Sequence, residues 1–195
     1  GTAPVTATVI VTPTFANDAV NCTGTADTFY ITVNPTATVN AINNQTVCNG
    51  AAVAAVTPTT TATGGTVTYA WTNDNAAIGL AASGTGTIPA FTAINTGTAP
   101  VTATITVTPS FTNNGLSCEG TVRTYTITIN PTATVNTVTN QVVCNGSAVT
   151  AVNFSTTATG GTVTYAWTNS NTTIGLLASG SGNIASFTAT NNGTA

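Results

Sequence analysis

The sequence predicts an all-β chain built from tandem antiparallel β-sandwich repeats. Three observations support this fold class: polar and apolar residues alternate in runs, long segments recur at a constant spacing, and Thr and Val are abundant. Only 3% of the 195 residues are charged, whereas 42% are hydrophobic. Disordered chains are poor in β-branched residues and carry net charge, so this composition favours a packed β core.

The alternation has a period of two residues. Val101, Ala103, Ile105 and Val107 share one face of a run, and the threonines between them share the other. Residues 125–129 follow the same pattern. Such alternation is typical of an antiparallel strand with one face on a core and the other in water. No stretch has a helical period, so we expect no helix.

The repeat has a constant offset. The segment GTAPVTATVIVTP at 1–13 returns at 97–109 as GTAPVTATITVTP, and the same 96-residue offset relates Cys22 to Cys118 and Trp71 to Trp167. A period near 100 residues is too long for one coil of a solenoid. It predicts one sandwich domain of about 96 residues per period.

Asn34-Pro35 and Asn130-Pro131 mark the expected domain junctions, because proline cannot donate to a β ladder. Residues 36–131 then form a complete domain. Residues 1–35 are the last two strands of a preceding domain, and residues 132–195 are the first five strands of a following one. The strands expected in the complete domain are 36–47, 51–57, 66–72, 77–82, 88–94, 100–109 and 121–130. Seven short strands with a Trp in the third match an immunoglobulin-type sandwich.

The incomplete ends are expected to complete one another. Either the natural chain continues past residue 195 and this sequence is a piece of a longer array, or another copy donates its residues 1–35 to residues 132–195. Both explanations predict that residues 5–12 and 25–33 of one copy lie against residues 163–167 of a copy placed before it.

Several motifs resemble the PKD-like and Ig-like tandem repeats of large surface adhesins from type IX-secreting, gliding-type bacteria. They are QTVCNG at 45–50, YAWTN at 69–73, IGL at 78–80 and SCEGTVRTYTITINP at 117–131. The resemblance covers the whole chain. It implies that the parent protein is a long exported adhesin or filament protein in which these repeats form the stalk.

The residue inventory argues against catalysis. There is no His, and Arg123 is the only basic residue, so we expect no binding of nucleic acid or anionic lipid. The acids Asp18, Asp27, Asp74 and Glu119 are not retained at equivalent positions of the other repeat. We interpret them as solvated turn residues and expect no enzyme, no metal site and no cofactor. No apolar run approaches the roughly 20 residues that cross a bilayer.

Four cysteines in a chain with few metal ligands predict disulfides and an extracellular location. Cys48 and Cys118 are the expected pair within the complete domain, where the closed loop would add about 4 kcal/mol of stability. Cys22 and Cys144 would then pair outside this sequence. The alternative is a staple from the first turn of one domain to the last hairpin of its neighbour, because these features lie at opposite ends of a standard sandwich. Peptide mapping of the oxidised protein distinguishes the two pairings.

The aromatic residues Trp71, Trp167, Tyr69 and Tyr165 fall on the apolar faces of their strands and are expected in the cores. The intervening threonines suit the polar face of a half-buried strand. A flat Thr surface that orders water or ice, or that carries O-linked sugar, is the alternative. Six sequons would carry glycan only in a host that glycosylates them: Asn21, Asn44, Asn145, Asn153, Asn171 and Asn192.

Together these features predict a structural or adhesive spacer that forms a stalk or filament on or outside the cell. Its expected partners are neighbouring repeats of the same protein, with head-to-tail copies allowed. One alternative is a module that binds carbohydrate or another surface, which exposed Trp side chains would favour. The other is the Thr-rich water- or ice-ordering surface, which a thermal hysteresis measurement would reveal.

Overall fold

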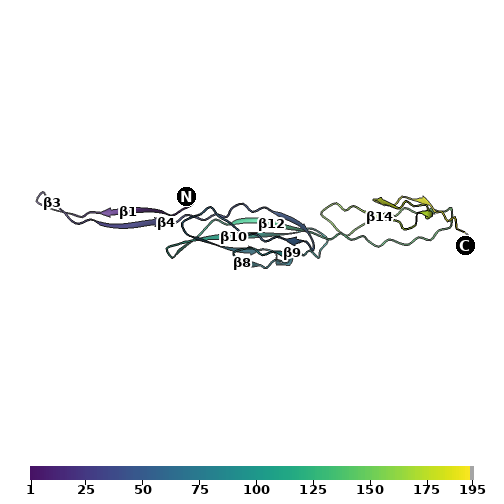
Figure 1. Cartoon of the computed structure of the whole chain (residues 1–195), viewed down its shortest axis with the longest axis horizontal. Coiled ribbons are helices and arrows are strands. Elements are labelled where there is room, and N and C mark those ends of the chain that lie inside the picture. The colour runs from purple at the N-terminus through teal and green to yellow at the C-terminus, as the bar shows by residue number, and fades with distance from the viewer. Residues whose placement is uncertain (194–195) are drawn as a thin grey trace. The chain divides into compact units, whose positions relative to one another are not determined.

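The computed structural model describes residues 1–193, and its regular structure is β-strand apart from two one-turn 3₁₀ helices. The all-β fold class is therefore confirmed. Residues 1–35 form a two-part hairpin in which β1 pairs antiparallel with β4 and β2 pairs with β3. Figure 1 shows β1 and β4 running side by side. The four strands are β1 (Val5–Val11), β2 (Thr14–Asn17), β3 (Val20–Thr23) and β4 (Asp27–Val33).

The next part of the chain contains a six-stranded sheet with the order β5-β12-β10-β7-β8, and β11 also pairs with β10. Its longest strand is β10, which pairs with β7 from Ile105 opposite Asn73 to Thr112 opposite Thr66. The strands are β5 (Gln45–Cys48), β7 (Thr66–Asn73), β8 (Ser83–Thr85), β10 (Val101–Asn113), β11 (Leu116–Glu119) and β12 (Arg123–Asn130).

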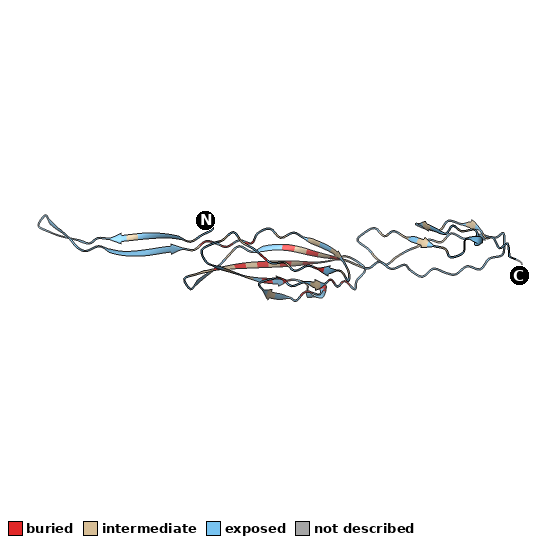
Figure 2. Ribbon diagram, in the orientation of Figure 1, coloured by how far each residue is buried: buried red, intermediate tan, exposed pale blue. Residues whose placement is uncertain are grey.

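β6 (Ala52–Val53) and β9 (Phe91–Thr92) pair antiparallel and form a separate two-stranded sheet. The core collects the alternate residues of β10 and β12 that the sequence assigns to one face, and Figure 2 shows them as red segments on those strands. Val53 and Ile88 are buried as well. A six-stranded and a two-stranded sheet around apolar side chains are consistent with a β-sandwich.

The strands beyond residue 131 are shorter. They are β13 (Ala148–Val149), β14 (Ala166–Thr168), β15 (Ser179–Ser181) and β16 (Phe187–Thr188). They form two separate two-stranded sheets, β13 with β16 and β14 with β15. The equivalent of β5, residues 141–144, has no strand structure.

The chain divides into two compact units. Unit 1 consists of Gly1–Val47, Ala51–Ala93 and Thr102–Thr128. Unit 2 consists of Cys48–Gly50, Ile94–Val101 and Ile129–Ala195. The boundaries expected from Asn34-Pro35 and Asn130-Pro131 stay a prediction.

Two local expectations from the sequence are wrong. Residues 77–82 form the 3₁₀ helix η1 (Ala76–Ile78) and a loop instead of a strand, and η2 (Thr172–Ile174) repeats this structure. The Asn75 side chain accepts a hydrogen bond from the Ala77 N–H, and Gly79 ends the turn at a φ of 98°. An Asn cap and a left-handed Gly together favour a helical turn over a strand. Of the expected strand 36–47, only Gln45 onward is extended as β5.

Candidate functional site

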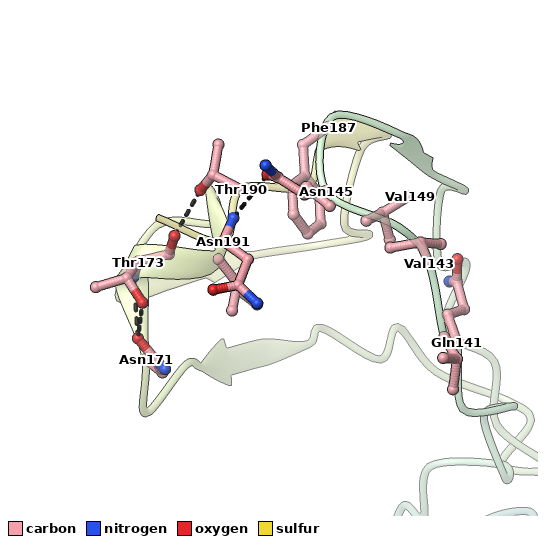
Figure 3. A pocket seen from close by; sticks show the side chains of 12 residues that line it. Gln141, Val143, Asn145, Val149, Asn171, Thr173, Phe187, Thr190 and Asn191 are labelled. Carbon is pink, nitrogen blue, oxygen red and sulfur yellow. Dashed lines mark hydrogen bonds between the residues drawn. The ribbon is translucent and has the colours of Figure 1, made fainter. Parts of the chain in front are cut away.

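The most prominent feature beyond residue 131 is an open cleft of about 510 Å³. Figure 3 shows Phe187 of β16 and Val149 of β13 at this cleft together with Val143. Two of the lining residues are joined by a hydrogen bond, in which the backbone N–H of Asn191 donates to the Asn145 side chain at 2.8 Å. None of the residues lining the cleft is charged: Gln141, Val142, Val143, Asn145, Val149, Asn171, Thr173, Ile174, Phe187, Ala189, Thr190 and Asn191.

Four equivalents of the lining residues are buried in the preceding repeat: Val53, Ile78, Ala93 and Asn95. Ile78 is fully buried, whereas its equivalent Ile174 is 40% exposed. Asn95 is also buried, and its side-chain amide donates to the carbonyl of Ile129 in β12 at 2.7 Å. In the described part of the chain, no strand stands in the place of β10 or β12 beside residues 132–193. The cleft is therefore the half-core that β10 and β12 fill one repeat earlier.

Strand lengths support this conclusion. β7 spans eight residues and pairs with β10 along its whole length. Its equivalent β14 spans only three residues, and these pair with β15. A strand needs partners for its backbone N–H and C=O groups. β14 is short because no counterpart of β10 pairs with it.

The hairpin of residues 1–35 has the opposite property. Its strands β1 and β4 are equivalent to β10 and β12, yet Figure 2 colours them almost entirely as exposed. Phe15 is 70% exposed, whereas its equivalent Phe111 is fully buried. Ile31 is 51% exposed, and its equivalent Ile127 is 1% exposed. The hairpin thus presents an apolar face whose residues are equivalent to the buried face of β10 and β12.

A contact between successive segments occurs twice with the same atoms. The backbone N–H of Thr63 donates to the carbonyl of Thr2 at 2.7 Å, and at the equivalent positions Thr159 donates to Thr98 at 2.7 Å. A proline also packs on a left-handed glycine in both cases: Pro4 on Gly64 and Pro100 on Gly160. Because an added Cβ would lie within 3 Å of the proline ring in both places, the contact requires glycine.

The four acids have separate structural positions. The Asp74 carboxylate accepts the Thr104 N–H at 2.7 Å, and the Asp27 carboxylate accepts the Thr28 N–H at 2.9 Å. Asp18 is in the β2–β3 turn with positive φ. The described residues contain no cluster of three or more metal-ligating side chains. The carboxylates of Asp74 and Asp27 therefore satisfy backbone N–H groups.

The predicted core aromatics differ in burial. Trp71 is 4% exposed, and its ring lies so close to Gly84 that a Cβ there would overlap the indole ring. Trp167 is in the same position over Gly180 but is half-buried, because β10 has no counterpart there. Tyr69 and Tyr165 are also half-buried, and the Tyr165 ring lies 5.5 Å from that of Phe154.

Tyr125, which the alternation of residues 125–129 places on the apolar face, is buried as well. Its side chain is 2% exposed, and its hydroxyl has no hydrogen-bond partner among the described residues. Burial raises the pKa of Tyr125 to about 12 and also raises the pKa of Tyr69. In both cases burial disfavours the charged phenolate.

The four cysteines are free thiols in the described structure. Cys48 ends β5, and the N–H of the adjacent Asn49 donates to the carbonyl of Asn130 at the end of β12. Cys118 lies opposite Phe111, near the far end of the 13-residue strand β10. These ends are about 30 Å apart at the strand rise per residue, and a disulfide needs Cα atoms within about 7 Å. The Cys48–Cys118 pair does not fit this geometry, and the staple between neighbouring domains stays a prediction.

The threonine faces and the sequons have identifiable contacts. Thr hydroxyls bond across strands, Thr102 with Thr128 at 2.9 Å and Thr6 with Thr32 at 2.8 Å. Such cross-strand Thr pairs support an ordinary polar sheet face. Three sequon side chains accept backbone hydrogen bonds that glycosylation would disturb: Asn44 from Thr126, Asn145 from Asn191 and Asn171 from Thr173.

Comparison with known proteins gives no identification, since no protein-family model and no curated protein matches the chain. Among the described residues, neither of the short helices has the length or apolar character of a membrane span. The feature that sequence reasoning missed is the role of Gly65. A Cβ there would lie 2.5 Å from the Phe111 ring, whereas at the equivalent Gly161 it would meet nothing within 4 Å.

Proposed function

We propose that this chain is a structural or adhesive spacer from a long extracellular protein, built of PKD-like or Ig-like repeats that form a stalk or filament. The observation that carries the proposal is the recurring contact of Thr2 with Thr63 and of Thr98 with Thr159. Repetition of one contact at the 96-residue period is what an array needs to propagate from repeat to repeat.

The repetition of the core-forming strands also supports a spacer. Residues 1–35 carry equivalents of the strands β10 and β12 that cover the core in the following part of the chain, so successive repeats carry the same core-forming strands. The resemblance to surface-adhesin repeats and the four cysteines support an extracellular setting. Burial of Trp71 weighs against the carbohydrate-binding alternative, because aromatic sugar platforms have to be exposed.

The location is tested with antibodies raised against the purified chain. We expect labelling of intact cells that produce the protein, at the same intensity before and after permeabilisation. A cytosolic protein is the control, since it should be labelled only after permeabilisation. Labelling of this chain only in permeabilised cells would contradict an extracellular spacer.

A further inference from the structure

We propose that residues 98–100, a Thr-Ala-Pro segment in the loop between β9 and β10, act as a tongue that locks one repeat to the next. The tongue docks on a socket formed by Thr159 and Gly160, and it keeps the two repeats from swivelling about the connection between them. This inference deepens the proposed spacer function, on which it rests for its biological setting, by naming the contact that stiffens a stalk.

The tongue and the socket both recur at the 96-residue offset. Thr-Ala-Pro stands at 2–4 and again at 98–100, and Thr-Gly-Gly stands at 63–65 and again at 159–161. In each case the backbone N–H of the socket threonine donates to the carbonyl of the tongue threonine at 2.7 Å. Each of the two contacts lies within one compact unit of the chain. The fold therefore brings the same tongue to the same socket twice.

The tongue proline fits the socket glycine closely. Gly160 has a φ of 75°, and a Cβ on it would lie 2.7 Å from the Cδ atom of Pro100. At the first contact, a Cβ on Gly64 would lie 2.8 Å from the Cδ atom of Pro4. Carbon atoms in ordinary contact are about 3.5–4.0 Å apart, so a side chain on the glycine would push the proline away. The docked position of the proline thus depends on glycine in the socket.

A buried asparagine holds the tongue in shape. Asn95 is 4% exposed, and its side-chain amide donates to the carbonyls of Ala99 at 2.9 Å and Ile129 at 2.7 Å. Its side-chain oxygen accepts the N–H of Gly97 at 2.9 Å. Because an unpaired buried polar group costs free energy, these bonds hold the loop against the end of β12. The tongue is therefore ordered by its own repeat and loses little conformational entropy on docking.

The tongue acts as a second attachment beside the covalent connection at residues 130–132. Asn49 ties the two together, because its side chain accepts the Asn95 N–H at 2.8 Å and donates to the Thr132 hydroxyl at 3.2 Å. Domains joined by one passage of chain and a small interface move relative to each other by default. A contact at a second point removes the rotation about the connection, and tethering lets even a weak contact close.

The test measures amide hydrogen exchange and ¹⁵N relaxation of the purified chain by NMR in reducing buffer. We expect the amides of Thr159 and Thr63 to be protected, because each donates across its contact. Gly160→Ala should raise the exchange rate of Thr159 at least about tenfold, since the new Cβ displaces the proline, and should leave Thr63 unchanged. Residues 101–129 and 144–188 should share one correlation time in the unmodified chain and tumble separately in Gly160→Ala.

Two controls separate the lock from local backbone strain. Gly182→Ala is the matched control, because Gly182 has a similar φ of 70° but an added Cβ there meets nothing within 4 Å. It should leave the Thr159 amide protected. Pro100→Ala removes the ring atoms that the new Cβ meets, so Gly160→Ala in that background should change the Thr159 exchange rate less than about twofold. Pro100→Ala alone should also raise this rate, without straining any glycine. Circular dichroism checks that each variant folds.

Several results would overturn the inference: an unprotected Thr159 amide or separate tumbling in the unmodified chain, no effect of Gly160→Ala or of Pro100→Ala, an equal effect of Gly182→Ala, or equal effects of Gly160→Ala in the presence and absence of Pro100. Failure of the spacer function is a different outcome, because it shows in the cell-labelling experiment and leaves these exchange rates unchanged.

Discussion

Replacing Trp71 with Ala is expected to lower the free energy of unfolding by about 3–5 kcal/mol. The indole is almost fully buried, lies opposite Val107 and covers Gly84, so its removal leaves a cavity that the surrounding strands cannot close. Urea denaturation of dilute protein, followed by circular dichroism, gives the free energy directly.

Trp167→Ala is the matched control. Trp167 packs on Gly180 as Trp71 packs on Gly84, but no strand equivalent to β10 lies beside it. A half-buried side chain has less transfer free energy to lose, so we expect roughly half the effect of Trp71→Ala. Equal losses for the two variants would contradict the assignment of β10 as the strand that closes the core.

The largest expected gain comes from completing the last repeat within one chain. A second copy of the sequence of residues 100–131, appended after residue 195, supplies the equivalents of β10, β11 and β12. We expect the repeat to gain an ordinary domain stability of about 5–15 kcal/mol. Ile174 should become as inaccessible as Ile78, and Trp167→Ala should then cost as much as Trp71→Ala.

Quenching of Trp fluorescence by acrylamide measures this change, since Trp71 and Trp167 are the two tryptophans of the chain. The control is the same extension with Asp in place of the Phe equivalent to Phe111. That extension should leave one tryptophan accessible, as in the original chain. If the unmodified extension also leaves Trp167 accessible, the appended strands do not fill the cleft.

Much of the fold could be predicted from the sequence because the alternation is strict. Val101 to Val107 and Tyr125 to Ile129 alternate between core and solvent as expected. The strand at 77–82 could not be predicted correctly, because a cap by Asn75 and a left-handed Gly79 outweigh the β propensity of the residues between them. Local side-chain hydrogen bonds of this kind leave only a weak trace in the sequence.

The candidate site was predictable in outline from the repeat alone, since residues 132–195 lack equivalents of the last strands. Its details were not. The need for glycine at Gly65 arises from the approach of the Phe111 ring, which only the folded chain brings there. The Cys48–Cys118 pairing stays a prediction, because residue spacing does not say which end of a strand each thiol occupies.

Amide hydrogen exchange of residues 162–169, compared in dilute solution between this chain and the chain extended by residues 100–131, tests most directly whether equivalents of β10 and β12 close the core of a repeat. These residues are equivalent to β7, which is fully paired in the closed repeat. We predict fast exchange in this chain and, in the extended chain, slow exchange that approaches the rate of residues 66–73. The exchange of residues 66–73 should be the same in both chains. Exchange of residues 162–169 that stays fast in the extended chain would contradict this account of the core.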